Sequence, residues 1–404
     1  MTYRQTMTLV GALALAGCAM THGEVDHDAG RSTPTADGGP RADAAACPSG
    51  LTPLDSLPQH FDAHHGPLSI ATDGATFWIA HFHGNPSPCD GPCLGLRALA
   101  ASGPIGEFGA LYWLYEADFE PALEVVSGVG RMLATAVDRR AAWQAWPVGP
   151  EPWRADASFH PPEGETVVSV APRRDGGVDL LLRGAPRGDV PTRVVSLGPT
   201  GDVIDDRAGP RFPTVLELRL VPSRGGARWI AAVEDWDFPA TVRIDRVEGP
   251  RVDSFHGARC GENAFDAREL DDARVVLAQR CGRMVWIEAR GDGGRAEPTT
   301  VTEAAAQVTP AVAVLERGRE VVVGYALEGA DAPTLERLRL GDDGRFRSIA
   351  RVTAPADPLV RLPIAALDVE ALDDGTIALA WRGRVPPEEF IASDGAVARF
   401  APCD

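Results

Sequence analysis

Residues 316–326 read Glu-Arg-Gly-Arg-Glu-Val-Val-Val-Gly-Tyr-Ala, and this pattern decides the fold. A turn at Gly318 leads into an apolar, β-branched run that is too short for a typical helix but suits a buried strand. The same pattern recurs as TDGATFWIAHF (72–82), SGVGRMLATAV (127–137), RRDGGVDLLLR (173–183), SRGGARWIAAVED (223–235), LDDARVVLAQR (270–280) and DDGTIALAWRG (373–383). Long amphipathic helical periodicity is missing from residues 47–404, so we expect an all-β domain there.

The spacing of these runs predicts a repeat architecture. The turns fall at Gly74, Gly130, Gly176, Gly225, Ala273, Gly318 and Gly375, which are 45 to 57 residues apart. In most copies two further runs follow around another turn, as in TRVVSLGPTGDVIDDR (192–207) and FIASDGAVARF (390–400). Four strands in each repeat of ~45–50 residues are typical of β-propeller blades.

The body of the chain therefore resembles seven-bladed β-propellers, with four antiparallel strands per blade, although it lacks the Gly-His and Trp-Asp signature of WD repeats. A pair of β-sandwiches, or a ring of six or eight blades, is the alternative. The second strand of each blade is expected to be buried between neighbouring blades. The first and seventh copies each contain four strand candidates, so we expect the ring to close without an N-terminal strand in the last blade.

The N-terminus has the form of an export signal. Residues 1–17 carry Arg4 and then an apolar run over residues 7–16, as secretory signals do. The stretch Leu15-Ala16-Gly17-Cys18 resembles the lipobox of bacterial lipoproteins. The resemblance implies cleavage before Cys18, a diacylglyceryl and an N-acyl group on that cysteine, and a membrane anchor. Ala19, where inner-membrane lipoproteins tend to carry Asp, favours the outer membrane of a Gram-negative bacterium. A plain cleaved signal with an incidental cysteine is the alternative.

Residues 18–46 are predicted to form a flexible, lipid-anchored tether, because they contain few large apolar groups to bury. Lipidation of Cys18 would leave six cysteines in an oxidising compartment, and six cysteines allow fifteen pairings. We favour Cys89–Cys93, Cys260–Cys281 and Cys47–Cys403, with the last pair as a clasp between the two ends of the domain. A zinc site built on Cys89 and Cys93 is the competing interpretation.

The overall charge restricts the kinds of partner. The chain has 57 acidic and 39 basic residues, a net charge of −18, and every basic residue is an arginine. Phosphate neutralisation needs a basic face, so a nucleic-acid partner is excluded.

One face of the ring carries the candidate ligand site. In propellers the loops after the second strands gather around the mouth of the central channel. The residues at those positions are Arg139, Arg183, Asp235, Arg280, Tyr325 and Arg382. Their mixed polarity suits a protein partner, a polysaccharide, or an anion held by arginine forks. The competing interpretation is that they are ordinary solvated loop residues.

His81 and His83 are the candidate metal ligands. They lie two residues apart on a predicted strand, so both rings point to one face, and zinc or copper could bind there with His64 or Asp62 as a third ligand. No nucleophile elbow, phosphate-binding loop or dinucleotide fingerprint occurs. We therefore expect no obligatory cofactor and a non-enzymatic binding or scaffold module of the cell envelope. The alternative is an envelope hydrolase or lyase at the channel mouth, assisted by a metal at His81 and His83.

Overall fold

A computed structural model of the chain describes residues 50–63, 68–72, 75–83, 93–112, 122–126, 129–135, 141–146, 157–173, 177–185, 189–213, 215–222, 229–234, 241–247, 264–271, 274–291, 294–295, 297–315, 319–360, 362–384 and 393–403. The chain divides into Met1–Ala45 and Ala46–Asp404, and the second unit contains every described residue. The predicted signal peptide (1–17), Cys18 and the predicted tether (18–46) lie outside the described residues. Within the described ranges, no helix is long and apolar enough to span a membrane.

The described part of the second unit is all-β, as predicted, and its strands form seven antiparallel sheets. In chain order the sheets contain β3 (Leu68–Thr72), β4 (Thr76–His83), β5 (Cys93–Ala100) and β6 (Gly106–Tyr112); β7 (Ala122–Val126), β8 (Val129–Thr135), β9 (Ala141–Trp146) and β10 (Ala157–Phe159); β11 (Glu165–Pro172), β12 (Val178–Gly184), β13 (Val190–Leu197) and β14 (Val203–Phe212); β15 (Glu217–Leu220), β16 (Trp229–Glu234) and β17 (Thr241–Arg246); β18 (Ala264–Asp271), β19 (Arg274–Cys281), β20 (Met284–Gly291), β21 (Gly294–Arg295) and β22 (Thr299–Thr302); β23 (Ala311–Val314), β24 (Glu320–Tyr325), β25 (Thr334–Leu340) and β26 (Phe346–Thr353); and β27 (Ile364–Ala371), β28 (Ile377–Gly383) and β29 (Ser393–Pro402), joined by β1 (Leu51–Pro53) and β2 (Gln59–Ala63).

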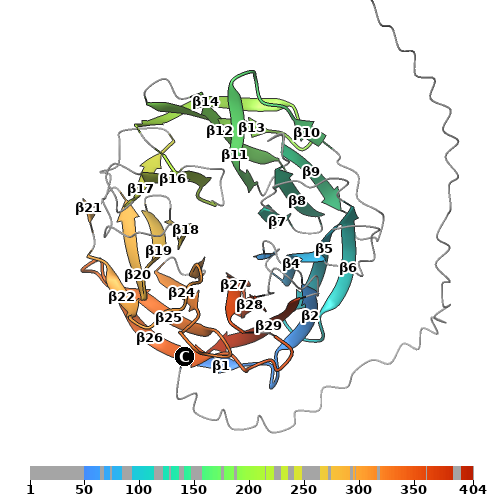
Figure 1. Ribbon diagram of the computed structural model, residues 1–404, viewed down its shortest axis with the longest axis vertical. Helices are drawn as coiled ribbons and strands as arrows, with labels where there is room; N and C mark the ends of the chain where they lie inside the picture. Colours follow the sequence, from blue (N-terminus) through green and yellow to red (C-terminus); the bar gives the residue numbers. More distant parts are fainter. Residues whose placement is uncertain are drawn as a thin grey trace, which may run out of the picture. The chain divides into compact units, whose positions relative to one another are not determined.

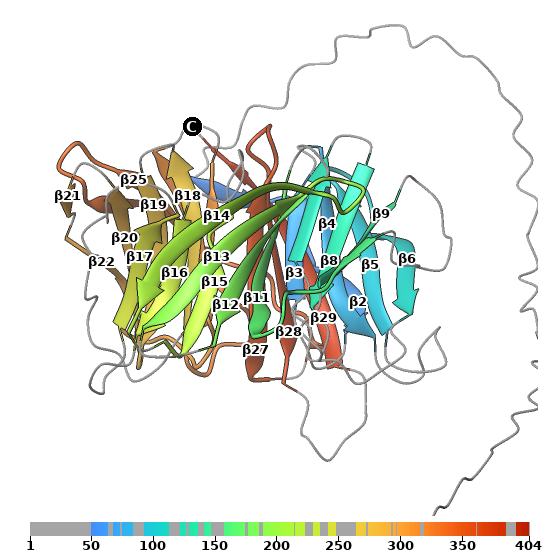
Figure 2. The ribbon, with the colours of Figure 1, turned by 90° about the horizontal axis from the view of Figure 1, so that it is seen from above.

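The sheets stand around a common axis, which is the arrangement of a β-propeller. Figure 1 shows β11, β18 and β27 toward the centre of the ring and β6, β14 and β26 on its rim, and Figure 2 shows the ring from the side. Adjacent first strands contact each other around the ring, through Arg219 and Phe265 in the case of β15 and β18, and β27 of the last sheet contacts β3 of the first. The ring is therefore closed on itself.

The second strands are buried between neighbouring sheets, as predicted. Along β16, Trp229, Ala231 and Val233 pack with residues of β18 and β19, whereas Ile230 and Ala232 pack with residues of β12 and β13. Side chains alternate between the two faces of a strand. Because both faces meet a neighbouring sheet, the strand has no solvent side and its sequence is continuously apolar.

The prediction of a turn within residues 390–400 is wrong. Ser393–Pro402 is one continuous strand, β29, and Gly395 pairs with Arg382 on one side and Phe61 on the other. A Cβ atom at Gly395 would lie 2.5 Å from the ring of Phe61. This glycine therefore leaves room for a buried aromatic ring instead of forming a hairpin turn.

The expectation that the ring closes without an N-terminal strand is also wrong. The last sheet has three strands of its own, and β1 and β2 together supply the fourth by pairing antiparallel with β29. Leu51 lies opposite Pro402, and Gln59 lies opposite Val397. We call residues 51–63 the closing strand. It joins the two ends of the domain through a backbone hydrogen-bond ladder.

A bulge over residues 54–58 separates β1 from β2, and Asp55 occupies it. The Leu54 amide donates to the Arg399 carbonyl (2.8 Å), and the Arg399 amide and Nε donate to Asp55 Oδ2 (3.1 and 2.9 Å). Both side chains are about nine-tenths buried or more. Burial alone would raise the pKa of Asp55, but the hydrogen bonds and charge of Arg399 outweigh it and hold that pKa below 3.8. The pair thus stabilises the fold above pH 4, and this contribution is lost as the pH falls through the lowered pKa.

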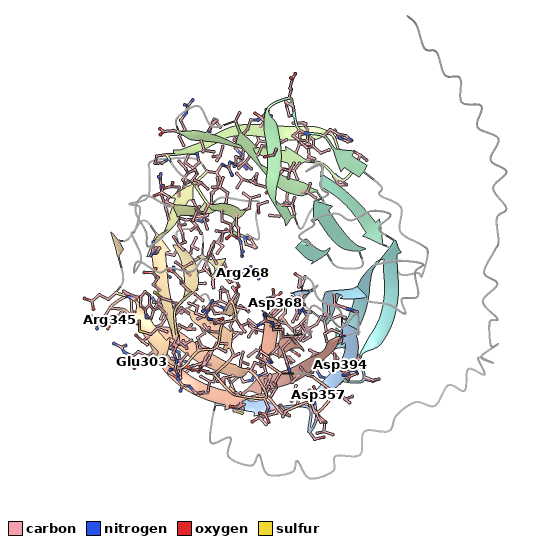
Figure 3. All side chains as sticks on the ribbon, viewed as in Figure 1. Arg268, Glu303, Arg345, Asp357, Asp368 and Asp394 are labelled. Carbon is pink, nitrogen blue, oxygen red and sulfur yellow. The ribbon has the colours of Figure 1, made fainter. Side chains whose placement is uncertain are left out.

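The closing strand and Arg399 of its partner β29 also hold the neighbouring sheets. Arg399 NH1 donates to the Ala100 carbonyl of the first sheet (2.8 Å), and the Gln59 amide group donates to the Gly103 carbonyl (3.0 Å). On the other side, His60 places Nε2 3.2 Å from Asp394 Oδ1 and Nδ1 3.5 Å from Asp357 Oδ2; Figure 3 labels both aspartates. Asp357 lies in the connection between β26 and β27. The N-terminal strand therefore ties together the sixth, seventh and first sheets.

We predict that Arg399→Ala lowers the free energy of unfolding by about 3–5 kcal/mol, because it leaves the Asp55 carboxylate buried without its cation. Denaturant unfolding of the domain measures this. Arg319→Ala is the matched control: it breaks the ion pair of Arg319 with Asp342, in which both side chains are well exposed, and it should cost less than about 1 kcal/mol. Equal losses in the two variants would contradict a special role for the closing strand.

Candidate functional site

The first strand of each sheet has an edge that no further strand of its own sheet covers. Backbone N–H groups at such an edge need acceptors when they are shielded from water. At three junctions a side chain of one sheet accepts from the edge of the next: Ser169 Oγ from the Leu220 amide (3.0 Å), Asp266 Oδ2 from the Val312 amide (2.9 Å) and Asp368 Oδ2 from the Ile70 amide (2.7 Å). We call these three contacts the edge bonds.

The three acceptors occupy equivalent positions on alternate sheets. Ser169 lies on β11, Asp266 on β18 and Asp368 on β27, and their second-strand partners are Leu181, Ala278 and Ala380. Two residues beyond those partners stand Arg183, Arg280 and Arg382, which are three of the predicted ligand-face residues. The third, fifth and seventh sheets therefore each carry one acceptor on the first strand and one arginine on the second strand.

Arg268 links two of the acceptors across an intervening sheet. From β18 it donates NH1 to Asp266 Oδ1 (3.0 Å), and its NH2 lies 3.9 Å from Asp368 Oδ1 on β27. The strand between them, β23, reads Ala-Val-Ala-Val and offers no bulky or charged side chain in the way. Figure 3 shows Arg268 and Asp368 near the centre of the ring. We call Asp266, Arg268 and Asp368 the axial cluster.

The axial cluster contains a carboxyl group that exchanges its proton near neutral pH. Burial raises the pKa of Asp368 to about 7. The charge of Arg268 and the Ile70 amide oppose this, whereas the charges of Asp266 and Glu370 reinforce it. The side chains of Arg268, Asp266 and Asp368 remain 22%, 17% and 12% exposed, so the cluster keeps some contact with solvent. Its chemistry is that of a guanidinium fork between two carboxyl groups.

The predicted ligand-face arginines lie in strands rather than in loops. Arg183 belongs to β12, Arg280 to β19 and Arg382 to β28. Arg280 is only 6% exposed, and its NH1 donates to the Gly282 carbonyl (3.1 Å); Arg382 NH1 makes a weaker contact with the Gly383 carbonyl (3.4 Å). Burial lowers the pKa of Arg382. The described contacts of Arg280 and Arg382 are with backbone carbonyls one or two residues further along the chain.

Tyr325 is buried at the end of β24. Its hydroxyl donates to Glu336 Oε2 (2.9 Å), and Arg351 Nε donates to the same oxygen (2.9 Å). Burial and the charge of Glu336 raise the pKa of Tyr325. The carboxylate of Glu234, next to the predicted Asp235, is likewise buried and accepts from Arg243 (2.8 Å). Arg139 and Asp235 themselves lie outside the described residues.

His81 is a core residue of the first sheet. It lies in β4, is 1% exposed, and its ring centroid is 5.0 Å from that of Phe61 in the closing strand. The side chains of His83, Asp62 and His64 lie outside the described ones. Among the described residues, no three His, Cys, Asp or Glu side chains are placed to hold a metal ion. The zinc or copper site stays a prediction.

The predicted disulfides fall partly outside the described residues. Cys281 ends β19 and Cys93 begins β5, but Cys47, Cys89 and Cys260 are not among the described residues. Cys403 follows β29, and its amide donates to the carbonyl of Gly50 (3.1 Å), three residues after Cys47. The three pairings stay predictions.

Comparisons with known proteins identify fold neighbours and no family. No protein-family model matches the chain, and no curated protein matches it. Among solved structures, the β-propeller domain of the Trilobed protease from Pyrococcus furiosus is 12% identical with a TM-score of 0.44, covering 81% of this chain and 92% of that one. The Aleuria aurantia lectin is 8% identical with a TM-score of 0.43, covering 71% of this chain and 98% of that one.

Prolyl oligopeptidase B from Galerina marginata is also similar, at 13% identity and a TM-score of 0.42. The match covers 80% of this chain, and the chain spans less than half of that protein, 46%. All three are similarities of fold at low identity, and they say nothing about what this chain binds or transforms.

Proposed function

We propose that this chain is a lipid-anchored, seven-bladed β-propeller of the cell envelope that binds a polar partner, a protein or a polysaccharide, through one face of the ring by way of the axial cluster. The observation that carries the binding role is the convergence of Arg268, Asp266 and Asp368 from two non-adjacent sheets on the ring axis. A guanidinium fork beside carboxyl groups can donate and accept hydrogen bonds at fixed geometry, which suits recognition of hydroxyl, amide or charged groups.

Several features favour binding over catalysis. The described carboxylates Glu320, Glu234 and Asp55 are each held by buried arginines at hydrogen-bond distance, so their charges serve the fold. Asp368 is the described carboxyl whose pKa is raised to about 7, and it is occupied by an edge bond. A hydrolase or lyase needs a titratable group free to meet substrate. The alternative of an envelope hydrolase or lyase assisted by a metal at His81 and His83 is disfavoured by the packing of His81 against Phe61.

The anchor proposal rests on the lipobox-like residues 15–18 and on the position of the closing strand. β1 and β2 form the outermost strand of the last sheet. An N-terminal anchor would therefore be connected to the domain through this rim strand. Outer-membrane location follows from Ala19 and is part of the same proposal.

The lysine-free sequence gives a sharp test of lipidation. Because all basic residues are arginines, the α-amino group is the chain's one expected primary amine, and N-acylation of Cys18 would remove it. We predict that the native protein fractionates with the outer membrane and does not react with an amine-specific ester. Cys18→Ser should release the protein into the soluble fraction and make it reactive. Amine labelling of the native protein, or membrane retention of Cys18→Ser, would refute the anchor.

Binding through the axis is tested by photo-crosslinking in intact cells. A photoreactive residue at Glu370, two positions from Asp368 on β27, should give an adduct of higher mass, and Arg268→Ala in the same chain should reduce its yield at least fivefold. The matched control is the same residue at Ile204, which is 51% exposed on β14 at the rim. Adducts from the rim alone, or a yield from Glu370 that is indifferent to Arg268→Ala, would contradict the proposal.

A further inference from the structure

The edge bond of Asp368 lies at the junction where the ring is closed. It joins β27 of the last sheet to β3 of the first, between residues 298 positions apart in sequence. The same junction is spanned by Gln59 of the closing strand, through its hydrogen bond to Gly103, and by Arg399 of β29, through its hydrogen bond to Ala100. The Ile70 amide and the Asp368 carboxyl are both buried, and their 2.7 Å hydrogen bond is the shortest of the three edge bonds.

The charged groups facing Asp368 come from few elements. Arg268 and Asp266 face it from β18, and Glu370 lies on its own strand. Of the strands packed against β27, β3 and β23 contain no ionisable residue. β28 contributes Arg382, which lies on the same face as Asp368, and β24 contributes Glu320 and Tyr325. Asp368 thus has two apolar strands beside it, with the Arg268 cation at 3.9 Å and the charges of two further carboxyl groups acting on it. If the junction opens, water reaches the carboxyl group and removes the burial that disfavours its charge.

We propose that protonation of Asp368 controls how tightly the ring closes between β27 and β3. In the closed ring the carboxyl group keeps its proton up to about pH 7, whereas in an opened junction it would ionise near its ordinary value of 3.8. The open form therefore loses its proton first, and rising pH favours opening. The other two edge bonds serve as internal comparisons: Ser169 cannot ionise in this range, and Asp266 is paired with Arg268 at 3.0 Å.

Hydrogen–deuterium exchange of the full-length protein, corrected for intrinsic rates, tests this directly. In the wild type, the opening equilibrium reported by Leu68–Thr72 should rise roughly 30-fold between pH 5.5 and 8.5, the value expected from carboxyl pKa values of about 7 closed and 3.8 open. In Asp368→Asn, whose amide oxygen can still accept from the Ile70 amide, the same segment should show no such rise. Glu217–Leu220, held by Ser169, should show none in either protein.

Two further variants report on the same group even if Asp368→Asn does not fold. Arg268→Gln removes the neighbouring cation and should move the midpoint of the wild-type pH profile upward, whereas Asp266→Asn removes a neighbouring negative charge and should move it downward. A flat wild-type profile, an unchanged profile in Asp368→Asn, or midpoints that move the other way would each overturn the inference. It concerns the ring itself and does not depend on the proposed ligand or anchor.

Discussion

The structure depends on one requirement, which is that a ring of separate sheets must be closed. The last sheet has only β27, β28 and β29 from its own repeat, and the N-terminal residues 51–63 complete it. This pairing converts an open row of sheets into a ring in which each sheet is supported on both sides. The buried Asp55–Arg399 pair holds the bulge at residues 54–58 against β29, because both the amide and the side chain of Arg399 donate to Asp55. Closing the ring in this way ties the start of the domain to its end without a long loop.

The three edge bonds also join neighbouring sheets, near the axis of the ring. Inner strand edges leave backbone amides that need acceptors, and Ser169, Asp266 and Asp368 supply them on alternate sheets. Using a carboxyl group for this purpose introduces an ionisable group where water is scarce. At Asp266 the charge is matched by Arg268 at 3.0 Å, whereas Asp368 has the same cation only at 3.9 Å. Burial, opposed by the charge of Arg268, raises the pKa of Asp368 to about 7. This group lies where the proposed binding face and the ring closure meet.

The sequence predicts those strands whose burial requires apolar residues. Second strands such as VVVGY and WIAAV are visible as unbroken apolar runs because both of their faces meet a neighbouring sheet. The closing strand was missed because its two halves, LTP and QHFDA, are short and half polar. The sequence predicts a turn at Gly395 because Asp-Gly usually forms one. The reason for the glycine is the ring of Phe61, which lies 334 positions earlier, so no local pattern indicates it.

The candidate site was harder to predict than the fold. The apolar run of each second strand ends before Arg183, Arg280 or Arg382, so the sequence predicts a loop at these positions. In the structure the backbone pairing of the strand continues through these arginines. The edge bonds join a side chain to a backbone amide, so no residue type marks the partner. One pattern in the sequence does indicate the site. The second strands of the third, fifth and seventh repeats end in LLLRG, LAQRCG and LAWRG, and the edge-bond acceptors lie on the same three sheets.

The most direct test of the account is hydrogen–deuterium exchange of the native chain over residues 51–63, compared with β29 and β27. If this segment is the fourth strand of the last sheet, its amides in β1 and β2 that face β29 should exchange as slowly as those of β29 itself, and the two should lose protection together in denaturant. Rapid exchange throughout residues 51–63, with β27, β28 and β29 still protected, would show that the ring is not closed by its N-terminus.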